Sequence, residues 1–167
     1  FGRFRDLLES SAKSQAMMWF LDNYQNTVRS NNENYARELL ELHSLGVDCG
    51  YDQFDVEQVT RIFTGWSGSY FSRIPPDPCA VGEVPPACDP NHYTEPNGFF
   101  FNNSAHDNLP KPNPSNPANV RDTVLGTTFP SGGGLQEGLR VLDIVSRHPC
   151  TARFISRKLI LQFVMDD

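Results

Sequence analysis

The sequence predicts a mainly α-helical domain with a long irregular, proline-rich insertion that carries a short β-hairpin. Apolar residues recur at helical spacing before residue 66 and again after residue 134. Between these parts, residues 67–131 hold most of the 13 prolines, which oppose helix formation. A chain of 167 residues is long enough for one domain that buries roughly 70% of its unfolded surface. We therefore treat residues 1–167 as one domain, with 67–131 as an insertion within it.

The first half of the chain predicts three helical segments. Residues 3–25 form a helical region with a break near residues 10–14. The next helix begins at Asn32, which can cap it, and ends at Gly46 in a left-handed conformation. A third helix begins at Asp52, where Asp55 approximates a capping box, and continues to Gly65. His43 falls in the middle of the apolar side of the second helix, so we expect a buried, hydrogen-bonded core residue rather than a metal or haem ligand.

The second half begins with the insertion, where the only strand-like pieces are residues 69–72 and 98–102. Helical periodicity returns at residues 135–147. Pro149 then starts a last helix, because proline is tolerated in the first turn, and this helix continues to about residue 165.

Glu38 and Glu41 lie one turn apart on the polar side of the second helix. This spacing suits a metal ligand pair or a paired acid and base. The alternative is ion pairing with basic residues such as Arg37, Arg153, Arg157 or Lys158, and the last helix, with Arg153 and Arg157 one turn apart, is the favoured source. The pairing hypothesis is favoured because no Glu-x-x-His motif appears elsewhere in the chain.

His106 and Asp107 form the second candidate group, together with nearby Lys111. An imidazole beside a carboxylate and an ammonium can transfer protons or hold an acidic substrate. The same residues can equally anchor a loop. No Gly-x-Ser-x-Gly motif or phosphate-binding glycine-rich loop is present, and no cofactor or metal is predicted.

Aromatic residues gather around the insertion. Such side chains can stack on sugars or line a partner's groove, or they can form the core that holds a helix-poor segment in place. The binding residues predicted on the first interpretation, with Lys111 added, are Trp66, Tyr70, Phe71, Tyr93 and Phe100.

Charge and cysteine content narrow the possible functions. The net charge of −6 disfavours a general nucleic-acid binder, which needs a basic face for phosphate. No run of eighteen apolar residues is present, so no membrane-spanning segment is predicted. The four cysteines lack Cys-x-x-Cys spacing, so zinc is not expected. Asn102 is a glycosylation acceptor if the source is eukaryotic. The even number of cysteines, which can pair as disulfides, and the glycosylation acceptor favour an oxidising, extracytoplasmic setting: secreted, periplasmic or at the cell surface.

Residues 32–48 closely resemble the signature of the domain of unknown function 1800 family of mostly bacterial proteins. The resemblance continues through motifs in the same order, at residues 1–8, 20–23, 64–66, 99–107, 125–126 and 148–159. It implies little about chemistry, because the family is named for lacking a known activity. It also implies that the chain is a fragment, because members of the family are considerably longer.

The sequence departs from this family pattern at Cys49 and Cys150, where the family usually has Gly and Ala. Two cysteines gained together suggest a disulfide. Counting alone allows three pairings of four cysteines. Local geometry favours Cys79 with Cys88, which close a compact proline-containing loop, and Cys49 then pairs with Cys150.

The predicted function is a binding or structural module of a secreted or surface assembly, with a protein or carbohydrate partner. The alternative is a hydrolase or metal-assisted enzyme that uses His106, Asp107 and either Glu38 or Glu41. Convergence of these side chains in one cleft would favour the enzyme.

Overall fold

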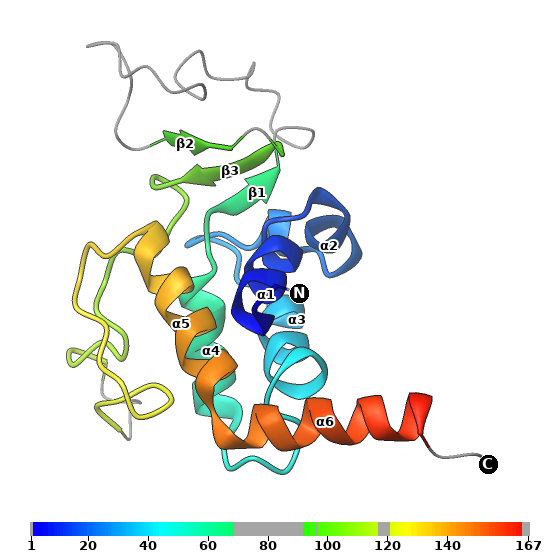
Figure 1. Ribbon diagram of the computed structural model, residues 1–167. Coiled ribbons are helices and arrows are strands. Elements are labelled where there is room, and N and C mark those ends of the chain that lie inside the picture. Colours follow the sequence, from blue (N-terminus) through cyan, green and yellow to red (C-terminus); the bar gives the residue numbers. More distant parts are fainter. Residues whose placement is uncertain (1, 69–91, 96, 117–120, 165–167) are drawn as a thin grey trace.

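The computed structural model describes residues 2–68, 92–95, 97–116 and 121–164. About half of the described chain is helical, with a small sheet at one end (Figure 1). The elements in chain order are α1 (Phe4–Ala12), α2 (Gln15–Phe20), η1 (Asn23–Gln25), α3 (Asn34–Glu38), η2 (Leu39–His43), α4 (Gln53–Ile62), β1 (Trp66–Gly68), β2 (His92–Thr94), β3 (Phe99–Asn102), α5 (Leu135–Arg147) and α6 (Pro149–Phe163).

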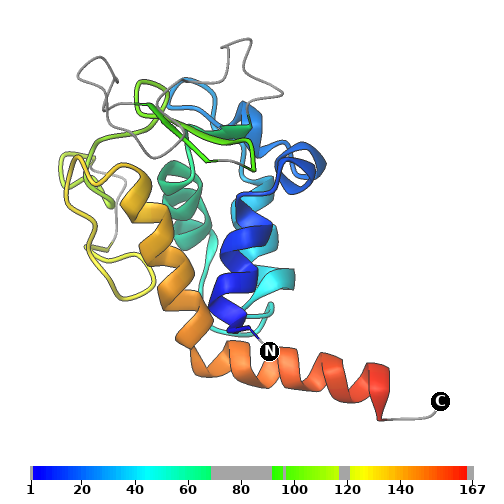
Figure 2. The same cartoon turned by 45° about the horizontal axis from the view of Figure 1, so that its top comes forward.

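The hydrophobic core lies between α1, α3, α4 and α5. Helix α5 packs against both α1 and α4, and α3 packs against the other side of α4. Figure 2 shows the same arrangement from a second direction. These helices, together with the π-helix η2 that continues α3, bury apolar side chains against one another, and this burial of apolar area holds them together. The fully buried aliphatic residues of this core include Leu39, Leu40, Val56, Val59, Ile62, Val141, Leu142 and Val145.

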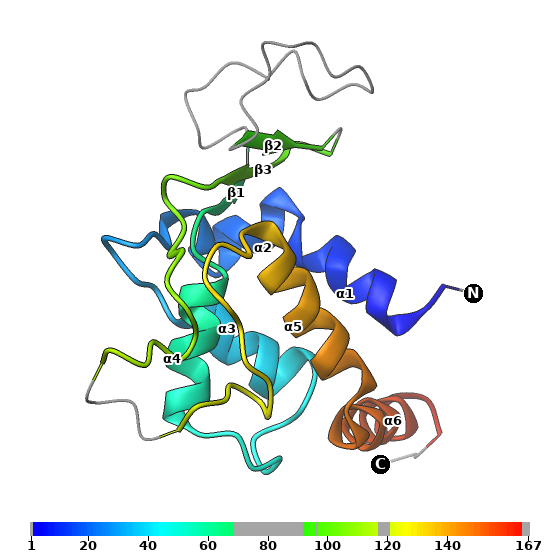
Figure 3. The ribbon, with the colours of Figure 1, turned by 90° about the vertical axis from the view of Figure 1, so that its left-hand side faces the viewer.

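The sheet has the strand order β1-β3-β2, and both strand pairs are antiparallel. In the central strand, Phe101 lies opposite Trp66 on one side and Tyr93 on the other. Figure 3 shows the sheet covering one end of the helices. The predicted strand at 98–102 is confirmed as β3, while 69–72 lies outside the described residues. The described part of the insertion belongs to the core, because Phe99, Phe101, Val124 and Phe129 are buried there.

Side-chain caps account for several helix boundaries. A break at Lys13 and Ser14 separates α1 from α2, and the Ser14 side chain accepts a hydrogen bond from the amide of Met17. The capping box of Asp52 and Asp55 at α4 is confirmed. Pro149 occupies the first turn of α6, where His148 caps the helix by accepting from the amide of Cys150.

The helix predicted from Asn32 to Gly46 is not a continuous α-helix. Glu33 takes the N-cap position, and the Asn32 side chain accepts a hydrogen bond from the amide of Asn34 instead. After Glu38 the chain widens into the π-helix η2. The Ser44 hydroxyl donates to the carbonyl of Leu39 at 2.6 Å, which satisfies one carbonyl of the widened turn. Gly46 then ends the helix at φ +81°, as predicted.

Helix α6 runs away from the other helices (Figure 1). Its second half carries exposed apolar side chains at Leu159, Ile160, Leu161 and Phe163. Among the described helices, none is long and apolar enough to cross a bilayer.

Candidate functional site

His106 and Asp107 are positioned by a close approach between the end of β3 and the end of α4. Gly65 makes this approach possible: a Cβ atom there would lie 2.5 Å from the carbonyl oxygen of Asn102, and its φ is +78°. Two turns after β3 then bring His106 and Asp107 beside Thr64. The Thr64 hydroxyl donates to the carbonyl of Arg61 at 2.6 Å and accepts from the amide of Asp107 at 2.8 Å.

The imidazole of His106 is buried between α4 and α5. Its Nδ1 lies 2.8 Å from the carbonyl oxygen of Thr64, and donation to that oxygen fixes the ring orientation. Its Nε2 lies 3.4 Å from Glu137 Oε2 and has no hydrogen-bond partner among the described residues. The ring also packs edge-on against Phe101.

Lys111 and Glu137 form an ion pair inside the protein. Lys111 Nζ donates to Glu137 Oε2 at 2.6 Å and also to the carbonyl of Asp107. Both side chains are almost completely buried. Burial lowers the pKa of Lys111, and the hydrogen bond and charge of Glu137 oppose this effect only in part. The other Glu137 oxygen accepts from the amide of Gly133. Removing either partner would destabilise the fold, because the remaining charge would be buried without compensation.

Asp107 connects this buried cluster to Arg61. Arg61 Nε donates to Asp107 Oδ2 at 2.7 Å, and a second guanidinium nitrogen donates to the carbonyl of Pro110. Asp107 Oδ1 accepts from the amide of Leu109 at 3.0 Å. Burial raises the pKa of Asp107, but these hydrogen bonds and the charges of Arg61 and Lys111 lower it more, so the net pKa lies below its ordinary value. Asp107 is therefore held as a carboxylate anion.

A pocket of about 460 Å³ opens beside Arg61 and Asp107. Its lining combines amides, carboxylates and two apolar side chains: Asn31, Glu33, Phe54, Glu57, Gln58, Thr60, Arg61, Asp107, Leu109, Asn113 and Asn116. His106, Lys111 and Glu137 do not line it. The cluster thus has two parts: a closed interior that positions the loop, and a polar surface at Arg61 and Asp107 that a ligand can reach.

Comparison with known families decides the identity of the chain. The family model described as "Protein of unknown function (DUF1800)" matches residues 1–167. The chain belongs to the DUF1800 family. Comparisons with curated proteins and with solved structures found no match.

In this DUF1800 domain, the predicted acidic pair does not join the His106 cluster. Glu41 pairs with Arg37 of its own helix at 3.5 Å, and among the described residues neither Glu38 nor Glu41 bonds to His106 or Asp107. The expected pairing with Arg37 is thus confirmed for Glu41, whereas the favoured partners on α6 are wrong: within the described residues neither Arg153 nor Arg157 pairs with Glu38 or Glu41, and Arg153 contacts Cys150 Sγ instead. Pairing within one helix needs only the four-residue spacing, so it does not depend on the position of α6.

His43 also differs from its prediction. It is half-buried, and within the described chain its ring has no hydrogen-bond partner. Burial lowers the pKa of His43, with Glu38 raising it and Lys158 lowering it further. The π-helix explains the change, because its wider turns take the side chains of η2 out of the 100° spacing that placed His43 among the apolar residues.

The predicted binding residues of the DUF1800 chain are mainly interior where they are described. Trp66 has 0% and Phe100 4% of its surface exposed, and Lys111 is buried in the ion pair. These side chains offer no aromatic surface to a ligand, because they hold the sheet against the helices. Tyr93 lies in β2, and Tyr70 and Phe71 lie outside the described residues. Asn102 ends β3 half-exposed, with its side-chain oxygen accepting from Ser104, and its glycosylation stays a prediction.

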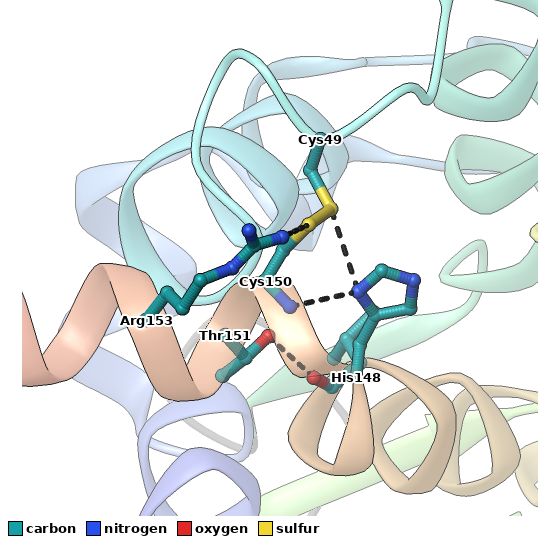
Figure 4. Close-up of a disulfide and its surroundings, with 6 residues drawn as sticks. Cys49, His148, Cys150, Thr151 and Arg153 are labelled. Atoms are coloured by element: carbon teal, nitrogen blue, oxygen red, sulfur yellow. Dashed lines mark hydrogen bonds between the residues drawn. A yellow bond between two sulfur atoms is a disulfide. The ribbon is translucent and has the colours of Figure 1, made fainter.

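The disulfide between Cys49 and Cys150 is confirmed, with 6.0 Å between its Cα atoms (Figure 4). The predicted partner pair, Cys79 and Cys88, lies outside the described residues. His148 completes a group of three whose Sγ and ring nitrogen atoms lie within 4.8 Å of one another, a spacing that suits a metal ion. Because the sulfurs are bonded to each other, neither is a thiolate and the group is not a metal site in this state.

Sequence reasoning missed Arg61, Thr64 and Glu137, the residues that organise His106 and Asp107. Arg61 and Thr64 stand in and just after the last turn of α4, and Glu137 in the first turn of α5, places where such residues are common. One signal for Glu137 was available, because the helical spacing places this residue on the buried side of its helix. A buried carboxylate needs a partner, so its position indicates an ion pair or hydrogen bond.

Proposed function

We propose that this domain is an extracytoplasmic binding module of a secreted or surface assembly, and that it holds a neutral carbohydrate in the pocket beside Arg61 and Asp107. The observation that carries the proposal is the composition of the pocket lining. Four side-chain amides, at Asn31, Gln58, Asn113 and Asn116, supply both donors and acceptors. Sugar hydroxyls need this mixture, because each hydroxyl both donates and accepts.

The charges of the lining favour a neutral ligand over an anionic one. Three carboxylates, at Glu33, Glu57 and Asp107, face one guanidinium, at Arg61. A phosphate or carboxylate ligand would be repelled by this excess of negative charge. Phe54 and Leu109 add apolar area on which the C–H face of a sugar ring can rest.

The state of Asp107 supports binding over the hydrolase alternative. A general acid or base works best with a pKa near the working pH. The pKa of Asp107 is instead lowered by its bonds to Arg61 and Leu109, which makes the carboxylate a good acceptor and a poor proton donor. His106, the other proposed catalytic residue, does not reach the pocket.

The proposed location outside the cytoplasm is supported by the Cys49–Cys150 disulfide, since such bonds persist in oxidising compartments. An Asn102 glycan would be in keeping with the same setting.

The test is a binding screen of the oxidised protein against neutral oligosaccharides, followed by calorimetry on each hit. N31A and E57Q should weaken binding at least several-fold, because both side chains line the pocket. N34A is the matched control: Asn34 is exposed on the nearby α3 but does not line the pocket, so affinity should stay within twofold. Preferential binding of basic peptides, cleavage of the sugar, or equal effects of N31A and N34A would each overturn the proposal.

A further inference from the structure

We propose that the Cys49–Cys150 disulfide is redox-active and exchanges with dithiol reductants while the domain stays folded. This activity is independent of the carbohydrate pocket. It is inferred from four features around the two sulfurs: a helix N-terminus, an arginine, a histidine and an open approach.

Cys150 lies in the first turn of α6, a helix of 15 residues. Unpaired amide groups give a helix N-terminus a partial positive charge, which stabilises a cysteine thiolate there. The cap orients this end, because the amide of Cys150 donates to His148 Nδ1 at 3.2 Å.

Two arginines and a histidine surround the sulfurs. A guanidinium nitrogen of Arg153 lies 3.5 Å from Cys150 Sγ, and Figure 4 shows it directed at the disulfide. His148 Nδ1 lies 3.4 Å from Cys49 Sγ, within reach of a proton on that sulfur. Arg157 lines the same side of the bond one turn further along α6. Asp48 is the only carboxylate in this lining, so the local balance is positive.

The bond is also accessible. Both cysteines are partly exposed. A pocket of about 390 Å³ is lined by both of them together with Arg153, Arg157 and the Phe154 ring. A disulfide with a purely structural role needs no such opening, whereas exchange requires an attacking thiolate to approach one sulfur in line with the S–S bond.

The geometry distinguishes the two sulfurs. The thiolate of the reductant attacks Cys49 Sγ, the S–S bond breaks, and its electron pair leaves on Cys150 as a thiolate beside Arg153. The second thiol of the reductant, as its thiolate, then attacks its own sulfur in the mixed disulfide and releases Cys49. The reductant loses two electrons and becomes a cyclic disulfide, the protein gains them, and the two protons lost by the reductant are taken up by Cys49 and by solvent or Cys150.

Other contacts hold α6 in place when the bond opens. The Phe154 ring packs against Gly46, and Lys158 Nζ donates to the carbonyl of Leu42 at 3.1 Å. The reduced domain is therefore expected to keep its fold, with the loop after η2 released from the start of α6.

The experiment treats the native oxidised protein with dithiothreitol without denaturant, quenches by alkylation, and follows the Cys49 and Cys150 peptides by mass spectrometry. Reduction should proceed while the helical circular dichroism signal is retained. R153Q should slow it several-fold, because the leaving thiolate loses its guanidinium. R29Q is the control, and its rate should stay within twofold of the wild type, because Arg29 is exposed and is not part of the lining around the disulfide.

A second readout requires no substitution. Brief treatment with glutathione, a monothiol that traps the mixed disulfide, should place the glutathione adduct mainly on Cys49. Reduction that occurs only in denaturant, equal rates for R153Q and R29Q, or adducts mainly on Cys150 would each overturn the proposal.

Discussion

Asp107 shows how the surroundings of a single carboxyl determine its role. Free in solution, an aspartate at this position would be an ordinary acid with a pKa near 3.8. Here burial raises the pKa, but Arg61, the amide of Leu109 and the charge of Lys111 lower it further than burial raises it. These partners come from α4 and from the loop itself, and they convert a candidate catalytic acid into a fixed anion.

The lowered pKa of Asp107 makes the stability of the fold depend on pH in the acid range. The folded chain holds the Asp107 proton less tightly than the unfolded chain. The ionised Asp107 therefore makes its full contribution to the free energy of unfolding above about pH 4. It is lost as the pH falls through the lowered folded-state pKa. We expect the urea midpoint of the wild type to fall between pH 5 and pH 3 more steeply than that of D107N. D122N, an exposed aspartate, should follow the wild type. Parallel curves for D107N and the wild type would contradict this.

At the scale of elements, the capping box of α4 carries a separable part of the stability. Asp52 accepts from the amide of Asp55 at 3.2 Å and also pairs with Arg121 at 2.6 Å. Asparagine keeps the cap and loses the charge, whereas alanine loses both. D52A should lower the free energy of unfolding by about 1 kcal/mol, and D52N by only a few tenths, because an exposed pair contributes little. Urea unfolding at neutral pH measures both. Equal losses would mean that the pair with Arg121, not the cap, is what matters.

Local signals predicted the helix ends well, and they failed where the helix changed type. Ser14, Asp52 and Pro149 each act through neighbours within a few residues, so the sequence contains the whole interaction. The π-helix after Glu38 depends instead on how the widened turn packs, and its effect reaches the apolar side chain of Leu42, which is 51% exposed.

At the scale of the whole molecule, the candidate site depends on contacts distant in sequence. Lys111 meets Glu137 across 26 residues, and Arg61 meets Asp107 across 46. Periodicity and capping describe one element at a time, so neither could show that α4, α5 and the loop after β3 meet there. The sequence singles out His106 and Asp107 as a pair, but the closed interior around His106 follows only from the assembled helices.

The Cys49–Cys150 disulfide joins two positions that are 101 residues apart in the sequence. Closing a loop of that length removes conformational freedom from the unfolded chain, which the chain-entropy model values at about 4.7 kcal/mol before any strain is subtracted. C49A/C150A should therefore lower the free energy of unfolding by up to about that amount, as measured by urea unfolding of the oxidised protein. The wild type in dithiothreitol should fall to the level of this variant. The variant's own response to dithiothreitol isolates any contribution of Cys79 and Cys88. A variant as stable as the oxidised wild type would show that the link does not restrict the unfolded chain as the model requires.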